Sequence, residues 1–152
     1  MWDFGGQSVF YSLHHLFITE HGIYLVAFNM THLAPSTATP ETTELAIDYL
    51  RFWLGSIALH APAAPFLLVG TFGDKVTTKA DHAAIDDMLV SRLKLVTNDQ
   101  LRTNATQSLS FYPVNNAKGA ANGDVGSQLL RKDSQRVVAE LPTLDRPVPI
   151  TW

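Results

Sequence analysis

The chain has 152 residues, 46% of them hydrophobic, and a formal net charge of −3. This is enough for one domain with a sizeable core, and the charge does not indicate a surface for nucleic acid or for an anionic membrane. Cysteine is absent, which excludes disulfides and thiolate metal sites and fits a cytoplasmic protein. The longest apolar stretch, Ile57–Gly70, is interrupted by His60, Pro62 and Pro65, so no transmembrane segment is predicted.

The first seven residues contain the pattern Asp3-x-x-Gly6-Gln7, whose spacing suits a loop that binds magnesium and a terminal phosphate. An Asp at the end of a strand can hold Mg²⁺, usually through water. A glycine three residues on lets its backbone N–H approach a γ-phosphate, and the glutamine can orient an attacking water. By itself the pattern is weak, because three fixed residues recur by chance, and an ordinary turn is the alternative.

Downstream of this pattern, a short irregular helix is predicted within the aromatic-rich segment Ser8–Ile18, and three apolar runs then predict strands: Ile23–Met30, Phe66–Gly70 and Leu109–Val114. The first run is continuously apolar, which suits a strand buried on both faces of a parallel sheet. Pro113 lacks a backbone N–H, so we expect the third strand at an edge or near its own end.

Three further helices are predicted between and after these strands. The first starts at Thr39-Pro40-Glu41, which supplies an N-cap, a proline at the first helical position and an acid in the first turn. It runs to about His60, with a core stripe of Leu45, Tyr49, Leu50, Trp53, Leu54 and Ile57. The second starts near Thr78 or Asp81, with an apolar face of Ile85, Met88, Leu89, Leu93 and Val96. The third covers Val125–Leu141 and packs Leu129, Leu130, Val137, Val138 and Leu141.

Strands that alternate with helices predict an α/β fold with a parallel sheet and right-handed crossovers. Ligands of such sheets bind at the carboxyl ends of the strands. Three polar segments are expected at such ends: Asp3–Gln7, Thr71–Asp74 and Asn116–Lys118. Their joint placement is stronger support for a nucleotide site than any one of them.

The chain resembles the Roc GTPase domain of Roco proteins, the group that includes leucine-rich-repeat kinases. The residues that carry the resemblance are Trp2–Gln7, Phe10-Tyr11, His14–Phe17, Ile23–Phe28 and Leu68–Asp74. Ras-like small GTPases share the skeleton and are a third interpretation, but the aromatic after Asp3 and the Phe-Tyr-x-x-His-x-x-Phe segment favour Roc. The resemblance implies a P-loop NTPase-like (Ras-like) three-layer sandwich with a parallel sheet, here without its first strands and P-loop.

By this resemblance Asp3 serves Mg²⁺, Gly6 faces the γ-phosphate and Gln7 positions water for catalysis, with GTP or GDP as the nucleotide of the intact domain.

The resemblance also assigns guanine binding to Thr71, Asp74, Asn116, Ala117 and Lys118. Thr71–Asp74 stands at the motif Asn/Thr-Lys-x-Asp, whose Asp carboxylate would accept two hydrogen bonds from the base. The motif lysine is Phe72 here, a departure that Roc domains often show, and the Phe72 ring could still cover the base. Asn116-Ala117-Lys118 resembles the Ser-Ala-Lys loop, whose backbone N–H contacts the guanine oxygen, with Asn in place of Ser.

The largest departure from the family is that no Gly-x-x-x-x-Gly-Lys-Ser/Thr occurs in the 152 residues, and this loop supplies most phosphate contacts. We therefore expect a fragment, a truncated gene model or a shortened paralogue. Without the family's first strand beside it, Ile23–Met30 is predicted to be an exposed apolar edge. The isolated polypeptide is expected neither to hold GTP tightly nor to hydrolyse it.

The predicted division is a partial Roc GTPase domain, residues 1–141, and a Pro-rich tail, residues 142–152, which resembles the join to a COR dimerisation domain. That implies a larger, dimeric, cytoplasmic parent. In one interpretation the parent is a switch in which GTP with Mg²⁺ orders Gly5–Phe17 and hydrolysis releases it. In the other, the chain is a nucleotide-free interaction module, a pseudo-GTPase or truncated paralogue.

Several polar residues invite a chemical role that their spacing does not support. His14 and His15 are adjacent and point to different faces of a helix, so they cannot chelate a metal as an i, i+4 pair would. His21, His32, His60 and His82 are scattered and expected at the surface. Asp86-Asp87 is expected on a solvated helix face.

Overall fold

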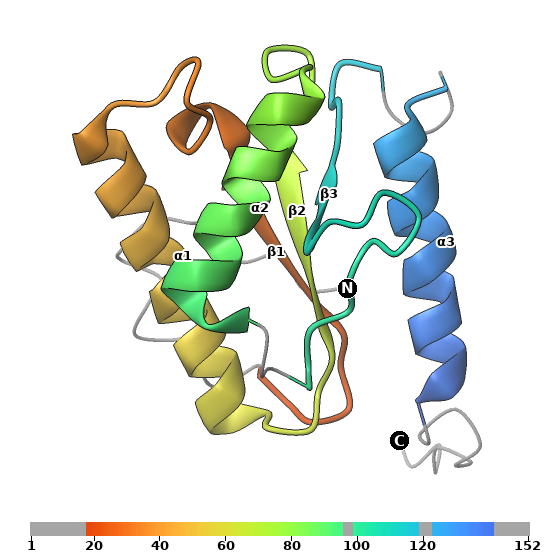
Figure 1. Cartoon of the computed structure of the whole chain (residues 1–152). Helices are drawn as coiled ribbons and strands as arrows, with labels where there is room; N and C mark the ends of the chain where they lie inside the picture. Colours follow the sequence, from red (N-terminus) through yellow and green to blue (C-terminus); the bar gives the residue numbers. More distant parts are fainter. Residues whose placement is uncertain (1–17, 96–98, 119–122, 142–152) are drawn as a thin grey trace, which may run out of the picture.

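A computed structural model describes residues 18–95, 99–118 and 123–141. Within these ranges the chain forms three strands, β1 (Tyr24–Asn29), β2 (Phe66–Thr71) and β3 (Phe111–Pro113), and three long helices, α1 (Pro40–His60), α2 (Lys79–Leu93) and α3 (Val125–Glu140). The strands are parallel and lie in the order β1-β2-β3, with each helix following one strand (Figure 1). The predicted α/β fold with a parallel sheet is confirmed.

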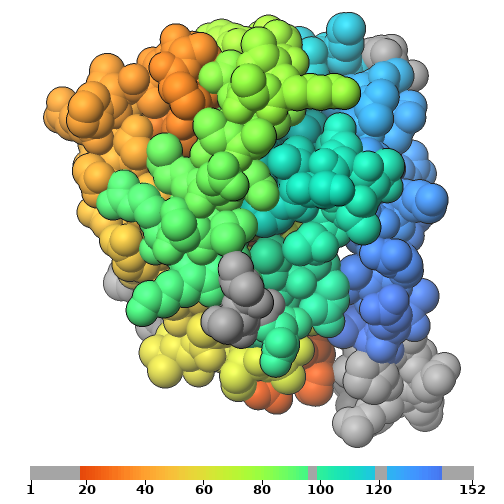
Figure 2. Space-filling view, viewed as in Figure 1, coloured from red at the N-terminus to blue at the C-terminus, as the bar shows by residue number. Residues whose placement is uncertain are grey.

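The two faces of the sheet carry different helices. Phe111 packs with Phe28, at 5.5 Å between ring centroids, in the core that also contains α1 and α2 residues such as Leu50 and Ile85. The next residue, Tyr112, must face the opposite side, and its hydroxyl bonds to Asp133 of α3. Helices α1 and α2 therefore cover one face and α3 the other, and Figure 2 shows α2 with residues 99–110 over the centre of the molecule.

Strand β1 is buried on one face only, so the prediction of burial on both faces is wrong. Val26 and Phe28 point into the core, whereas Leu25, between them, is 53% exposed. β1 is also an outer strand of the described sheet, which agrees with the predicted exposed apolar edge. A strand is buried completely only when it has a neighbouring strand on each side and helices on both faces of the sheet. In the described residues, β1 has a neighbouring strand on one side only.

Strand β3 is shorter than the predicted Leu109–Val114. Leu109 turns back instead of joining the sheet: its N–H donates to the Asn104 carbonyl at 3.2 Å, and the Asn104 N–H donates to the Leu109 carbonyl at 2.9 Å. Pro113 ends the strand on the outer side of the described sheet, as its missing N–H predicts.

Helix α1 has the bounds that its capping residues predict. The Thr39 hydroxyl accepts a hydrogen bond from the Thr42 N–H at 3.2 Å, and the Thr42 hydroxyl accepts one from the Thr39 N–H at 3.0 Å. This reciprocal pair is a capping box, and Pro40 follows it at the first helical position.

The predicted core stripe of α1 is right except at one position. Leu50, Trp53, Leu54 and Ile57 are buried, whereas Leu45 is 65% exposed. Near this end of the helix, Ala46 and Ile47 are the buried residues instead.

A bidentate ion pair joins α1 to α2. The Arg92 guanidinium donates to both carboxylate oxygens of Glu44, each at 2.7 Å. Hydrogen bonding to Arg92 lowers the pKa of the Glu44 carboxyl, and the same contact raises the pKa of Arg92. Within the described residues, no helix is both long and apolar enough to cross a membrane.

Helix α2 begins at a polar cluster centred on Asp81, which is 8% exposed. The N-cap residue Thr78 accepts from the Asp81 N–H at 3.0 Å and donates its hydroxyl to the Asp81 carboxylate at 2.7 Å. Ser36, from the segment before α1, donates its hydroxyl to the same carboxylate at 3.0 Å. These hydrogen bonds, that from Thr78 first, lower the pKa of the Asp81 carboxyl despite its burial.

We expect Asp81 to make the fold acid-sensitive. A carboxyl whose pKa is lower in the folded chain stabilises it at pH values above the unfolded pKa of about 3.9, and this contribution is lost as the pH falls through the folded pKa. Asp81→Asn should lower stability at neutral pH and flatten the loss of stability below about pH 5. Urea unfolding of both proteins from pH 6 to pH 3 measures this.

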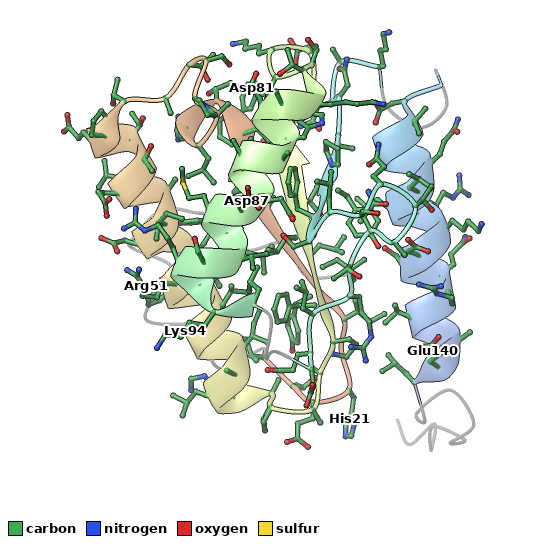
Figure 3. The ribbon with its side chains drawn as sticks, viewed as in Figure 1. His21, Arg51, Asp81, Asp87, Lys94 and Glu140 are labelled. Carbon is green, nitrogen blue, oxygen red and sulfur yellow. The ribbon has the colours of Figure 1, made fainter. Side chains whose placement is uncertain are left out.

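The matched control is Asp87→Asn, because Asp87 lies on the same helix but at the surface (Figure 3). Its pH dependence should follow that of the unsubstituted chain. An Asp81→Asn variant as acid-sensitive as the unsubstituted chain would refute the assignment.

Helix α3 approaches β3 closely. A Cβ on Gly126 would lie 1.6 Å from the Pro113 carbonyl oxygen, so only glycine permits this contact between helix and strand. The buried Tyr112 hydroxyl lies 2.9 Å from the Asp133 carboxylate and 3.0 Å from the Thr103 carbonyl. Burial, and then the bond to Asp133, raise the pKa of the Tyr112 phenol.

The predicted face of α3 is only partly right. Val137 is buried, Leu129 and Leu130 are half-buried, and Val138 is 41% exposed. The buried stripe contains Asp133 instead, because its charge has a partner in Tyr112.

Candidate functional site

The carboxyl ends of β2 and β3 bring two predicted guanine segments together (Figure 1). Pairing continues beyond β3, where the Val114 N–H donates to the Gly70 carbonyl at 2.7 Å. The Gly73 N–H in turn donates to the Val114 carbonyl at 2.9 Å. The Thr71–Asp74 turn and the Asn115–Lys118 loop are therefore held side by side.

Gly73 sets the spacing of these two segments. A Cβ at this position would lie 2.9 Å from the Val114 carbonyl carbon and oxygen and 3.1 Å from the Asn115 nitrogen. These are backbone atoms, which cannot move aside as a flexible side chain can. A side chain at residue 73 would separate the turn from the loop.

The Thr71–Asp74 turn has an unusual backbone. Phe72 has a φ of 64°, a left-handed conformation that bulky residues rarely adopt. Its ring is 40% exposed, and the Lys75 ammonium lies over the ring, 5.2 Å from its centroid. Asp74 is exposed at the tip of the turn.

Thr71 has a structural contact. Its hydroxyl donates to the Phe28 carbonyl of β1 at 2.9 Å. The side chain therefore ties β2 to β1 at their carboxyl ends and fixes the start of the turn.

The Asn115–Lys118 loop is closed by a residue outside the predicted set. The Asn115 side-chain oxygen accepts from the Ala117 N–H at 3.0 Å and from the Lys118 N–H at 3.2 Å. Asn116, Ala117 and Lys118 are all exposed. A guanine oxygen would therefore have to replace Asn115 as the acceptor for these backbone donors. Asparagine side chains often accept hydrogen bonds from the backbone two or three residues on, so the sequence could have identified Asn115 as the residue that closes this loop.

The predicted phosphate and magnesium residues Asp3, Gly6 and Gln7 lie outside the described residues, as do His14 and His15. In the described part of the chain, no group of three His, Asp or Glu side chains could hold a metal ion. A predicted Mg²⁺ contact thus depends on Asp3.

Two other polar residues differ from the prediction. His82 is half-buried, with its Nε2 2.9 Å from the Val76 carbonyl and its ring edge-on to Phe111. Asp86 is not merely solvated: its carboxylate accepts from the Ser110 N–H at 2.5 Å and from the Ser110 hydroxyl at 2.6 Å. Asp86 thus holds the residue that precedes β3, and His82 packs against the first residue of β3. His21, His32 and His60 are exposed, as predicted.

A groove of about 350 Å³ lies beside β1. Its lining comes from β1, α1 and the end of β2, and includes Ala27, Phe28, Asn29, Leu45, Tyr49 and Thr71. The exposed Leu45 of α1 thus borders this groove rather than the core.

A parallel sheet covered by helices on both faces, with polar loops at the carboxyl ends of adjacent strands, defines a doubly wound α/β protein and is consistent with part of a Ras-like P-loop NTPase domain. The family model "Ras of Complex, Roc, domain of DAPkinase" matches residues 1–74. Residues 1–74 therefore belong to the Roc family, and the resemblance predicted from the sequence is confirmed.

Curated relatives extend the similarity beyond the family model. "Probable serine/threonine-protein kinase roco6" of Dictyostelium discoideum is 28% identical over 149 residues, which are 98% of this chain and 6% of the relative. "Probable serine/threonine-protein kinase pats1" of the same organism is 38% identical over 76 residues, or 50% of this chain and 2% of the relative. "Leucine-rich repeat serine/threonine-protein kinase 1" of Mus musculus is 32% identical over 79 residues, or 52% of this chain and 3% of the relative.

The chain thus spans only a few per cent of the length of these relatives. No solved structure gives a significant match.

Proposed function

We propose that this chain is the C-terminal portion of a Roc-type GTP-binding domain, a guanine-nucleotide-dependent switch within a larger signalling protein. The observation that carries the proposal is the pairing of the Thr71–Asp74 turn with the Asn115–Lys118 loop through Gly73 and Val114. This pairing leaves Asp74 exposed beside the loop. Its carboxylate would accept two hydrogen bonds from guanine, which adenine cannot donate.

The remaining guanine contacts would come from the loop and from the base of the turn. The N–H groups of Ala117 and Lys118 would donate to the guanine oxygen once Asn115 releases them. Asn116 would occupy the position of the serine in the family's Ser-Ala-Lys loop. Thr71 would act by holding β2 to β1 through its bond to the Phe28 carbonyl.

The phosphate end of the site would come from the Roc-matched N-terminal residues. Asp3 would hold Mg²⁺, Gly6 would face the γ-phosphate and Gln7 would orient the attacking water. GTP with Mg²⁺ would order Gly5–Phe17, and hydrolysis would release this segment. Residues 1–141 would form the partial Roc domain, and residues 142–152 would lead towards a COR-like domain of a dimeric, cytoplasmic parent.

Two observations favour a second candidate, a nucleotide-free interaction module. No P-loop sequence occurs in the 152 residues, and the Ala117 and Lys118 donors are already satisfied by Asn115. Such a module would bind a partner at β1, the outer strand of the described sheet, where Leu25 is exposed.

A thermal unfolding experiment separates the two candidates. The purified chain is expected to show the same Tm with and without 1 mM GTP and Mg²⁺, because it lacks the P-loop. A chain extended upstream over an encoded P-loop should be stabilised by about 3 kcal/mol when GTP exceeds its Kd about a hundredfold, a rise of several degrees in Tm.

Two outcomes would count against these proposals. Stabilisation of the unextended chain by GTP would contradict its expected inability to hold nucleotide. If no P-loop is encoded upstream, or the extended chain does not respond to GTP, the interaction module becomes the better account. ATP serves as the control nucleotide, and Asp74→Asn in the extended chain should abolish the preference for GTP.

A further inference from the structure

The guanine motif of the family has a lysine where this chain has Phe72, but the structure brings another lysine to the same place. Lys75 follows the motif, and its ammonium lies 5.2 Å from the centroid of the Phe72 ring. We propose that Phe72 and Lys75 together form a stacking platform for the base, in which Lys75 supplies the charge of the missing motif lysine. This inference rests on the proposed guanine-nucleotide function and adds to it a specificity-determining residue outside the motif.

The backbone of the turn holds the platform in place. The Phe72 carbonyl accepts hydrogen bonds from the Lys75 N–H at 3.0 Å and from the Val76 N–H at 3.2 Å, which bends the chain back so that Lys75 reaches the ring. The neighbouring Gly73 is anchored to Val114. The ring is therefore held outward in a left-handed backbone conformation, with φ at 64°, that costs free energy in a residue of this size.

The chemistry of the pair suits a purine. An aromatic ring carries negative charge on its faces, so a cation over one face is attracted to it. The ring is 40% exposed, which leaves area for a base to stack, and bases stack on aromatic side chains with useful affinity. Asp74 extends from the same turn, so one short segment would hold both the face of a guanine and its edge.

The test is an NMR titration of the chain with guanosine monophosphate (GMP), and with adenosine monophosphate (AMP) as the second ligand. Both nucleotides are taken to concentrations far above that of the unfolding experiment, because without the P-loop only weak binding through the base is expected. Stacking on Phe72 should move the H8 signal of GMP upfield and transfer saturation to it from the phenylalanine ring. Lys75→Met should weaken GMP binding about two- to fivefold, the effect of an exposed cation–π contact. Lys79→Met, at an exposed lysine of α2, is the matched control and should change nothing.

Repeating the Lys75→Met substitution in a Phe72→Lys variant shows whether Lys75 acts through the Phe72 ring. Phe72→Lys restores the family residue, so Lys75→Met should have no effect on GMP binding in that variant. An equal loss in both backgrounds would mean that Lys75 acts on the phosphate and not through the ring, and would overturn the proposal.

The remaining outcomes separate the platform from the proposed function. If the chain prefers GMP to AMP and Lys75→Met leaves that preference and the affinity unchanged, the platform fails and the guanine site stands. If the unsubstituted chain binds GMP no better than AMP, the guanine-binding proposal fails, and the platform fails with it.

Discussion

Gly126→Ala is expected to destabilise the chain by about 3 kcal/mol, at the upper end of the cost of overpacking. The added methyl carbon would lie 1.6 Å from the Pro113 carbonyl oxygen, a backbone atom that is part of β3. Helix α3 would have to move away from the sheet, which would also stretch the contact between Tyr112 and Asp133. Urea unfolding followed by circular dichroism measures the loss.

Gly55→Ala is the matched control, since it makes the same substitution inside α1. A Cβ on Gly55 would meet nothing within 4 Å, so the change should stabilise the chain by about 0.5–1 kcal/mol through helix propensity. The two variants are thus expected to differ in sign. A Gly126→Ala protein as stable as the unsubstituted chain would show that α3 does not pack on β3 as described.

Tyr112→Phe is expected to cost about 2 kcal/mol, since it removes the hydroxyl next to a buried carboxylate. Tyr112 is fully buried and Asp133 is 8% exposed. After the substitution, the Asp133 carboxylate would keep Arg136, whose Nη2 is 3.4 Å away, but would lose its partner inside the structure. The ring itself stays, so the volume of the core is almost unchanged.

The double variant Tyr112→Phe, Asp133→Leu identifies the cause. When both polar partners are replaced by apolar groups of similar size, the cost of the unpaired carboxylate disappears, so the double variant should recover most of the lost stability. A double variant that is less stable than Tyr112→Phe alone would attribute the loss to packing. Urea unfolding of the three proteins at neutral pH is the measurement.

Local signals in the sequence predicted the elements well. Thr39, Pro40 and Glu41 predicted the start of α1, because a capping residue, a fixed φ and an acid act within one turn. Thr78 predicted the N-cap of α2 in the same way. The apolar runs Ile23–Met30 and Phe66–Gly70 predicted β1 and β2, since each run is bounded by residues that break strands.

Interactions between distant residues were not predictable in this way. Periodicity shows that a helix has an apolar side, but Leu45 and Ala46 are adjacent, and only the position of the sheet decides which is buried. Asp86 and Asp133 look like surface acids until Ser110 and Tyr112, more than twenty residues away, are brought to them.

At the candidate site, too, the positions of the segments were predictable from the sequence, but the contacts of their side chains were not. The sequence predicted that Thr71–Asp74 and Asn116–Lys118 lie at strand ends, because each segment closely follows an apolar run that predicts a strand. It did not predict that Asn115 occupies the donors of the loop, or that Lys75 lies over Phe72. Both depend on side-chain directions within a turn, which residue type alone does not determine.

The order of the strands has a consequence for how this part of the chain assembles. Within the described sheet, β2 pairs with β1 and β3 pairs with β2, so this part of the sheet can grow in one direction as the polypeptide leaves the ribosome. The unit of β3 and α3 comes last in the chain and pairs with one side of β2. Because Phe111 of β3 packs against Phe28 of β1, opening of this unit would also expose the core that β1 and α1 share. We expect the amide hydrogens of β2, which has a neighbour on both sides, to exchange with solvent most slowly.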